Sequence, residues 1–141
     1  MKTVLIPYLI FNGRDTANAM NFYKSIFGGE LTIQTFADAG MTQNESEKDY
    51  VIHSELKSDD INFMASSGHE GEEVKFGDNI TMSLMGEDEE KLTEWFNKLT
   101  EGGKVDLKLE KQFWGDTYGQ VTDKFGVHWS VNISSGQPLS T

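Results

Sequence analysis

The chain has 141 residues, 37% of them hydrophobic, which is enough for one domain with a core of its own. Its 12 basic and 23 acidic residues give a net charge of -11, which argues against nucleic acid or an acidic membrane as a partner. No cysteine is present, so disulfides, thiolate catalysis and cysteine zinc sites are excluded.

The first half of the sequence predicts a strand, a helix and three further strands. Residues 3–11 are β-branched and aromatic, as in a buried strand, and no small-residue cleavage site follows them. No apolar run reaches the roughly 20 residues that span a bilayer, so we expect a cytoplasmic protein without a membrane partner. A helix follows, capped by Asp15 or Thr16 and ended by Gly28. Alternating strands are predicted at 30–36, 50–57 and 61–66, with a polar loop at 38–49.

The second half repeats this order. A strand begins near Ile80, and a helix follows with Asp88 as its cap and Gly102-Gly103 at its end. Further strands are predicted at 104–109, 119–122 and 127–133. When the two halves of the sequence are aligned with each other, Phe22 falls on Phe96. The sequence therefore predicts an α+β fold in which one domain, residues 1–141, contains two tandem βαβββ units at about 3–66 and 79–133. Since each unit alone buries little surface, we also expect a homodimer.

Several short motifs resemble those of a known superfamily. They are Pro7-Tyr8-Leu9, Phe11-Asn12-Gly13, Phe22-Tyr23 to Gly28-Gly29, Phe113-Trp114-Gly115, Tyr118-Gly119, the run from Val121 to Val127, and Trp129. Together they resemble the PhnB-like branch of the vicinal oxygen chelate superfamily, which includes glyoxalase I, bleomycin-resistance proteins and extradiol dioxygenases. This branch is also labelled 3-demethylubiquinone methyltransferase-like. The resemblance covers essentially the whole chain.

The resemblance implies that each unit curls a mixed sheet into a half-open trough, and that paired troughs enclose a site. A divalent metal usually binds there, held by His or Gln on the first strand of each unit and Glu on the last. Here those positions fall at Pro7 or Tyr8, within residues 79–82, and at Ser130 or Asn132. None carries His, Glu or Asp. We therefore expect no metal site and no cofactor; the alternative is a divalent metal on atypical ligands such as His53, Glu55 and His128.

His53 and Glu55 are the candidate catalytic residues. They alternate with Ile52 and Leu56, so they should share one mixed face of their strand with Val51. On that face His53 could serve as an acid or base near neutral pH, oriented by Glu55. The structural alternative is a half-buried histidine bonded to a neighbour.

The candidate ligand-binding residues are aromatic, apolar or imidazole side chains expected near the trough: Tyr8, Phe11, Met82, Phe113, Trp114 and His128. Phe113 and Trp114 could stack on a flat ligand or instead fill a gap beside the second helix. His128 alternates with Trp129, and we expect Trp129 to pack in the core. His69, in an acidic loop, fits solvation better than metal binding.

We therefore expect a small-molecule-binding protein whose ligand lies in the trough between the units. The alternative is a lyase- or transferase-type enzyme using His53 as acid or base, so the sequence leaves open whether the protein is an enzyme. A third reading is a partner protein whose trough is filled by its own side chains. The sequence has no glycine-rich strand-to-helix turn for S-adenosylmethionine, so it does not support the methyltransferase label.

Overall fold

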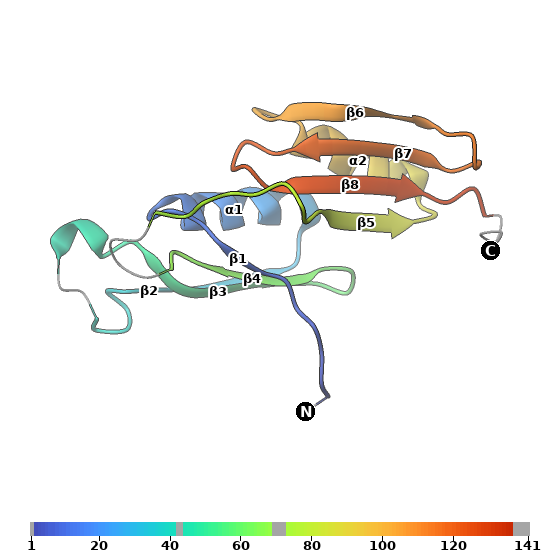
Figure 1. The fold of residues 1–141 in the computed structure, drawn as a ribbon. Helices are drawn as coiled ribbons and strands as arrows, with labels where there is room; N and C mark the ends of the chain where they lie inside the picture. Colours follow the sequence, from blue (N-terminus) through green and yellow to red (C-terminus); the bar gives the residue numbers. More distant parts are fainter. Residues whose placement is uncertain (1, 42–43, 69–72, 137–141) are drawn as a thin grey trace. The chain divides into compact units, whose positions relative to one another are not determined.

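The computed structural model describes residues 2–41, 44–68 and 73–136. The chain divides into two compact units, Met1–Lys75 and Phe76–Thr141. Each unit runs strand, helix and three strands, which confirms the predicted α+β fold with two βαβββ repeats (Figure 1). Within the described ranges, no helix is both long and apolar enough to cross a membrane.

The first unit is a four-stranded sheet with one helix. Its elements are β1 (Tyr8–Ile10), α1 (Asp15–Phe27), β2 (Glu30–Thr35), the short 3-10 helix η1 (Glu45–Glu47), β3 (Val51–Lys57) and β4 (Asn62–Ser66). The strand order is β1-β4-β3-β2. Strand β1 runs parallel to β4, and the other pairs are antiparallel. Helix α1 packs against β2, β3 and β4.

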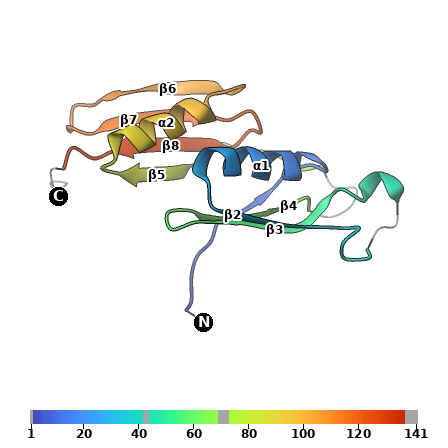
Figure 2. The same ribbon diagram turned by 180° about the vertical axis from the view of Figure 1, so that it is seen from behind.

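The second unit has the same topology. Its elements are β5 (Met82–Gly86), α2 (Glu89–Leu99), β6 (Lys104–Lys111), β7 (Thr117–Thr122) and β8 (His128–Ile133). The order is β5-β8-β7-β6, with β5 parallel to β8. Helix α2 lies across β7 and β8 (Figure 2) and packs against them and β5.

In each unit the core lies between the helix and one face of the sheet. In the first unit Tyr23 of α1 is fully buried and meets the ring of Phe63 at 5.5 Å. In the second, Phe96 and Leu99 of α2 are buried on the same side as Trp129 of β8. The helix therefore leaves the opposite face of each sheet available for side chains that do not belong to the core.

The first strand is shorter than the predicted 3–11. It begins after Pro7, which has no backbone N–H and accepts a hydrogen bond from Met64 at 3.0 Å through its carbonyl. Residues 4 and 5 lie outside the sheet, and the Leu5 side chain is 95% exposed. The pairing of this strand is limited by proline and by the five-residue length of β4.

The predicted cap of α1 is wrong, whereas that of α2 is confirmed. Asp88 accepts a hydrogen bond from the Lys91 N–H, as a capping residue does. In α1 the cap position is Arg14, which makes no side-chain cap bond. Thr16 is fully buried, and its hydroxyl lies 2.9 Å from that of Ser67. Because Ser67 donates to the Gly13 carbonyl, Thr16 must donate to Ser67.

A β-bulge changes the alternation predicted for β3. Thr35 pairs with Val51 and Gln34 with His53, so Ile52 is skipped in the register. Val51 is consequently fully buried, as Leu56 is, and not on the mixed face with His53 and Glu55. Periodicity alone cannot reveal a bulge, because the extra residue resets the phase of the strand.

Candidate functional site

We call the sheet face opposite the helix the helix-free face. In the first unit it carries Tyr8, Ile10, Thr32, Gln34, His53, Glu55 and Met64, by strand register and alternation. In the second unit it carries Ser83, Met85, Tyr118, Gln120, Thr122, His128, Ser130 and Asn132. Both sets are rich in hydroxyl, amide and imidazole groups, as is common for a sheet face that is not packed on the core. These groups are available for hydrogen bonds to a ligand.

In the first unit the helix-free face brings together Tyr8, His53 and Glu55. The Tyr8 hydroxyl lies 3.1 Å from His53 Nδ1, and the two ring centroids are 5.8 Å apart. Glu55 pairs with Met64, which in turn pairs with Tyr8, so the three strands β3, β4 and β1 carry this row. The catalytic roles of His53 and Glu55 stay predictions.

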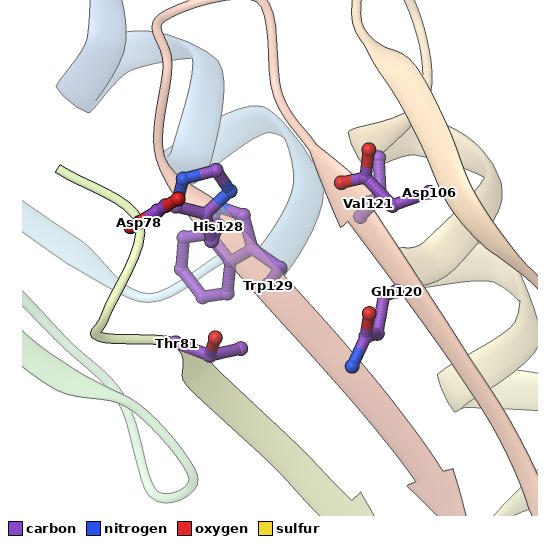
Figure 3. A pocket seen from close by; sticks show the side chains of 7 residues that line it. All are labelled: Asp78, Thr81, Asp106, Gln120, Val121, His128 and Trp129. Atoms are coloured by element: carbon purple, nitrogen blue, oxygen red, sulfur yellow. The ribbon is translucent and has the colours of Figure 1, made fainter. Parts of the chain in front are cut away.

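In the second unit an open pocket of about 200 Å³ lies at one end of the helix-free face. Figure 3 shows its seven lining residues: Asp78, Thr81, Asp106, Gln120, Val121, His128 and Trp129. In the view of Figure 3, Asp78 and His128 are drawn on the left, and Gln120 and Asp106 on the right. The pocket therefore combines two carboxylates, an imidazole, an amide and a hydroxyl, which suit a ligand with several hydrogen-bonding groups.

A chain of hydrogen bonds fixes His128 in this pocket. Its Nδ1 lies 2.9 Å from the Thr122 hydroxyl, which donates to Asp106 Oδ2 at 2.6 Å. Its Nε2 lies 3.1 Å from the carbonyl oxygen of Gly77. Both ring nitrogens are thus engaged, so His128 is held in one orientation at the pocket wall.

The helix-free face continues from this pocket to a group of aromatic side chains. The Gln120 amide donates to the Tyr118 hydroxyl at 3.0 Å, and the Tyr118 ring lies 6.0 Å from that of Trp114. Phe113 meets Trp114 edge-on at 4.9 Å and is 96% exposed. The expectation that Phe113 fills a gap beside the second helix is therefore not met. Both rings are available for stacking.

Asp116 anchors the turn that carries these aromatic residues. Its carboxylate accepts hydrogen bonds from the Asn132 side chain at 3.0 Å and the Ser135 N–H at 3.1 Å. These bonds, the Asn132 bond first, hold the pKa of Asp116 below its ordinary value of 3.8. The ionised carboxylate thereby ties the turn to the end of β8.

This anchor predicts an acid-sensitive contact. Because the folded pKa of Asp116 is lowered, its stabilisation is present above the ordinary value of 3.8 and is lost as the pH falls through the folded value. We expect the Ser135 amide resonance to stay constant down to about pH 4 and to shift only below it. An Asp116→Asn variant should show no such shift. A Ser135 response already complete at about pH 6 in the wild type would contradict this assignment.

Two of the expected ligand-binding residues lie on the helix-covered side instead. Phe11 is 1% exposed, and its ring lies 6.5 Å from that of Tyr23 in the core, tilted by 40°. Met82 pairs with the buried Trp129, so it faces α2. The physical reason is that both faces of these short first strands carry apolar residues, so the phase of the strand could not be fixed from the sequence.

The strands at which the resemblance implied metal ligands carry hydroxyl, phenol, amide and apolar side chains on the helix-free face. The helix-free face carries Tyr8 and Ile10 on β1, Ser83 and Met85 on β5, and Ser130 and Asn132 on β8. The Ser83 and Ser130 hydroxyls bond each other at 2.8 Å. No group of three or more His, Cys, Asp or Glu residues that could hold a metal occurs in the described part of the chain. His69 lies outside the described residues.

Sequence reasoning missed most of the pocket. It singled out His128 but not Asp78, Thr81, Asp106 or Gln120. The alternation of Tyr118, Gln120 and Thr122 along one strand was the available signal, since three polar side chains at every second position mark one non-core face. Asp78 and Asp106 come from other elements, and only the folded unit brings them together.

Comparison with known proteins gives a consistent assignment. A family model described as 3-demethylubiquinone-9 3-methyltransferase matches residues 3–132. Protein YjdN of Escherichia coli (strain K12) is 26% identical over 145 residues, covering 95% of this chain and 97% of its own length. The crystal structure of protein PA1353 from Pseudomonas aeruginosa shares 31% identity with a TM-score of 0.79, over 94% of this chain and 98% of that one.

A more distant structure supports the fold alone. A member of the glyoxalase/bleomycin resistance protein/dioxygenase superfamily from Sphaerobacter thermophilus DSM 20745 is 17% identical with a TM-score of 0.56. It covers 95% of this chain and 98% of its own. This likeness confirms the glyoxalase/bleomycin-resistance fold expected from the sequence motifs, and function does not follow from it.

Proposed function

This chain belongs to the 3-demethylubiquinone-9 3-methyltransferase family, and we propose that it is a small-molecule-binding protein rather than a methyltransferase. Its ligand occupies the helix-free face of the second unit, between the Asp78–His128 pocket and the aromatic pair Trp114–Tyr118. The superfamily's metal triad has no part in this proposal. No cofactor is required, and the function is binding without chemistry.

One observation carries the proposal. The helix-free face of the second unit joins an open pocket of about 200 Å³ to a stacking surface through a continuous row, His128, Gln120 and Tyr118. Sites for small molecules combine a hollow, flat aromatic walls and a few convergent polar groups. The two strand-to-helix connections, residues 11–14 and 87–88, do not form the glycine-rich turn that nucleotide-type cofactors need.

The test uses the protein's own tryptophans. Trp129 lines the pocket and Trp114 lies beside Tyr118, so a ligand bound along this row should change their fluorescence. We expect at least one compound of a panel of aromatic polar metabolites and antibiotics to give a saturable change. Gln120→Ala should weaken that binding roughly tenfold, which corresponds to about 1.4 kcal/mol for a lost polar contact.

Gln34→Ala is the matched control, because Gln34 occupies the helix-free face of the other unit. Its affinity should equal that of the wild type. Equal weakening by both substitutions, or no saturable change with any compound, would contradict the proposed site. If Gln120→Ala bound the compound with the affinity of the wild type, the ligand site would also have to lie elsewhere.

A second candidate function is favoured by the contact between Tyr8 and His53. A hydroxyl 3.1 Å from Nδ1 fixes the ring and leaves Nε2 for a substrate, which is the arrangement an acid–base enzyme needs. On this reading the protein is a lyase- or transferase-type enzyme. A variant of the same reading adds a divalent metal held by atypical ligands. Metal content of dialysed protein, measured for the wild type and His53→Ala, separates the two: stoichiometric metal lost in the variant would favour the enzyme.

The homodimer remains part of the proposal. Each four-stranded sheet ends in two edge strands, β1 and β2 in one unit and β5 and β6 in the other. Backbone groups of such strands can pair with a second copy of the chain. Sedimentation equilibrium should give twice the monomer mass of 15.9 kDa.

A further inference from the structure

His128 makes contacts that cannot all be hydrogen bonds when its ring is neutral. The Thr122 hydroxyl has one proton, and at 2.6 Å from a carboxylate oxygen it donates that proton to Asp106. Thr122 must then accept from His128 Nδ1, which lies 2.9 Å away. The Gly77 carbonyl can only accept, so Nε2 must donate to it at 3.1 Å. All these bonds coexist only when both ring nitrogens carry a proton.

Loss of one proton therefore forces one contact to break. The bond from Thr122 to Asp106 is charge-assisted, whereas the bond to the Gly77 carbonyl joins neutral partners. The Thr122–Asp106 bond survives in either neutral form of the ring, but it polarises the Thr122 oxygen and makes it a stronger acceptor for Nδ1. The Nδ1 contact, at 2.9 Å, is also shorter than the Nε2 contact, at 3.1 Å. The neutral ring should therefore keep its proton on Nδ1, toward Thr122. Nε2 and the Gly77 oxygen then face each other as two acceptors, and that contact is lost.

We infer that His128 is a proton-operated latch that holds the segment of residues 77–81 against β8 and so sets the shape of the ligand pocket. Gly77 begins this segment, and Asp78 and Thr81 within it line the pocket. Protonation closes the latch and neutralisation releases it. Only the statement that this pocket binds a ligand rests on the proposed function. The latch is a property of the unliganded protein.

The charged groups around His128 come from three elements. Strand β6 contributes Asp106, with Lys104 at 3.9 Å from its carboxylate. The segment itself contributes Asp78. In the turn between β7 and β8, Asp123 accepts from the Trp129 indole, and Lys124 lies over the ring of Phe125. Strand β7 contributes Thr122, an uncharged residue whose hydroxyl contacts the His128 ring. Only Asp106 is reached from the ring by a described chain of hydrogen bonds, through Thr122.

The test is a titration of the ¹⁵N-labelled full chain by NMR, without ligand, from about pH 5 to pH 8, where imidazoles change charge. We expect the Gly77 and Asp78 amide resonances to follow the same pH profile as the His128 ring nitrogens. At the acid end both ring nitrogens should give the chemical shifts of protonated imidazolium. At the alkaline end Nδ1 should carry the remaining proton.

Three variants make the test specific. His128→Gln should abolish the pH response of the Gly77 and Asp78 amides, while His53→Gln, in the other unit, should leave it unchanged. Thr122→Val keeps the branched shape but removes the hydroxyl, so a neutral ring can give its proton to Gly77. In this variant the Gly77 amide resonance should stay constant over the same pH range.

The latch would be overturned if the pH response of the Gly77 amide persisted in His128→Gln. It would also be overturned if the wild type showed no such response. An unchanged Gly77 response in Thr122→Val would overturn it as well. These results leave the proposed binding function intact, since no ligand is present. Conversely, a ligand screen without any binding compound would contradict the proposed binding function and would leave the NMR test of the latch unaffected.

Discussion

Asp123→Ala is expected to lower the free energy of unfolding by about 3 kcal/mol. The Asp123 carboxylate is 3% exposed and accepts three hydrogen bonds. Oδ1 accepts from the N–H groups of Phe125 and Val127, and Oδ2 accepts from the Trp129 indole at 2.8 Å. Removal leaves three donors without this acceptor, in the turn that joins β7 to β8. Urea unfolding measures the loss.

Two further variants test the cause. Asp123→Asn keeps an oxygen for the turn but places an amide N–H₂ against the Trp129 indole N–H, so it should cost about 1 to 2 kcal/mol. Asp78→Ala removes an exposed carboxylate from the same unit and should change stability by less than about 0.5 kcal/mol. Equal effects of Asp78→Ala and Asp123→Ala would show that charge, rather than the turn, is responsible.

Gly119→Val is expected to destabilise the protein by about 2 to 3 kcal/mol or to prevent folding. Tyr118 pairs with Glu110 and Gln120 with Leu107, so two residues of β6 bulge opposite Gly119. A Cβ at Gly119 would lie 2.8 Å from Leu109 Cα and 3.0 Å from the Phe96 ring. The backbone atom cannot move aside as a flexible side chain could, so the bulge and the helix packing must both shift.

Gly86→Ala is the matched control for this prediction. Gly86 also lies in a strand of the second unit, but a Cβ there meets only the Leu92 side chain, at 3.6 Å. That distance is an ordinary van der Waals contact, so stability should change by less than about 1 kcal/mol. Thermal unfolding of both variants compares them directly, and equal loss in the two would refute the steric argument.

The fold could be predicted because its signals are local and repeated. Two helices, each followed by a Gly-Gly pair and set between alternating strands, required no knowledge of long-range contacts, although α2 ends at Leu99 and not at Gly102-Gly103. Asp88 was identifiable as a cap because its side chain acts on its own helix. Thr16 was predicted as a cap but is buried against Ser67, a partner that is far away in the sequence. The bulge at Ile52 of β3 and the bulge of β6 opposite Gly119 likewise depend on a partner strand.

The candidate site was predicted only in part, for a related reason. The helix-free face holds His53 and Glu55 together, as alternation predicted, and it also holds Tyr8. Phe11 and Met82 were placed wrongly, because the phase of a short strand cannot be fixed when residues on both faces are apolar. The pocket at His128 joins Asp78, Asp106 and Gln120 from different elements. No single segment of the sequence carries a pattern that predicts this pocket.

The central claim is that a small molecule binds on the helix-free face of the second unit. The most direct test is NMR chemical-shift mapping with a compound that gives saturable binding. We predict that the perturbed resonances cluster at Thr81, Trp114, Tyr118, Gln120 and His128, with the buried residues of α2 unaffected. Perturbations confined to α2, or to Tyr8 and His53 in the first unit, would contradict this account and place the site elsewhere.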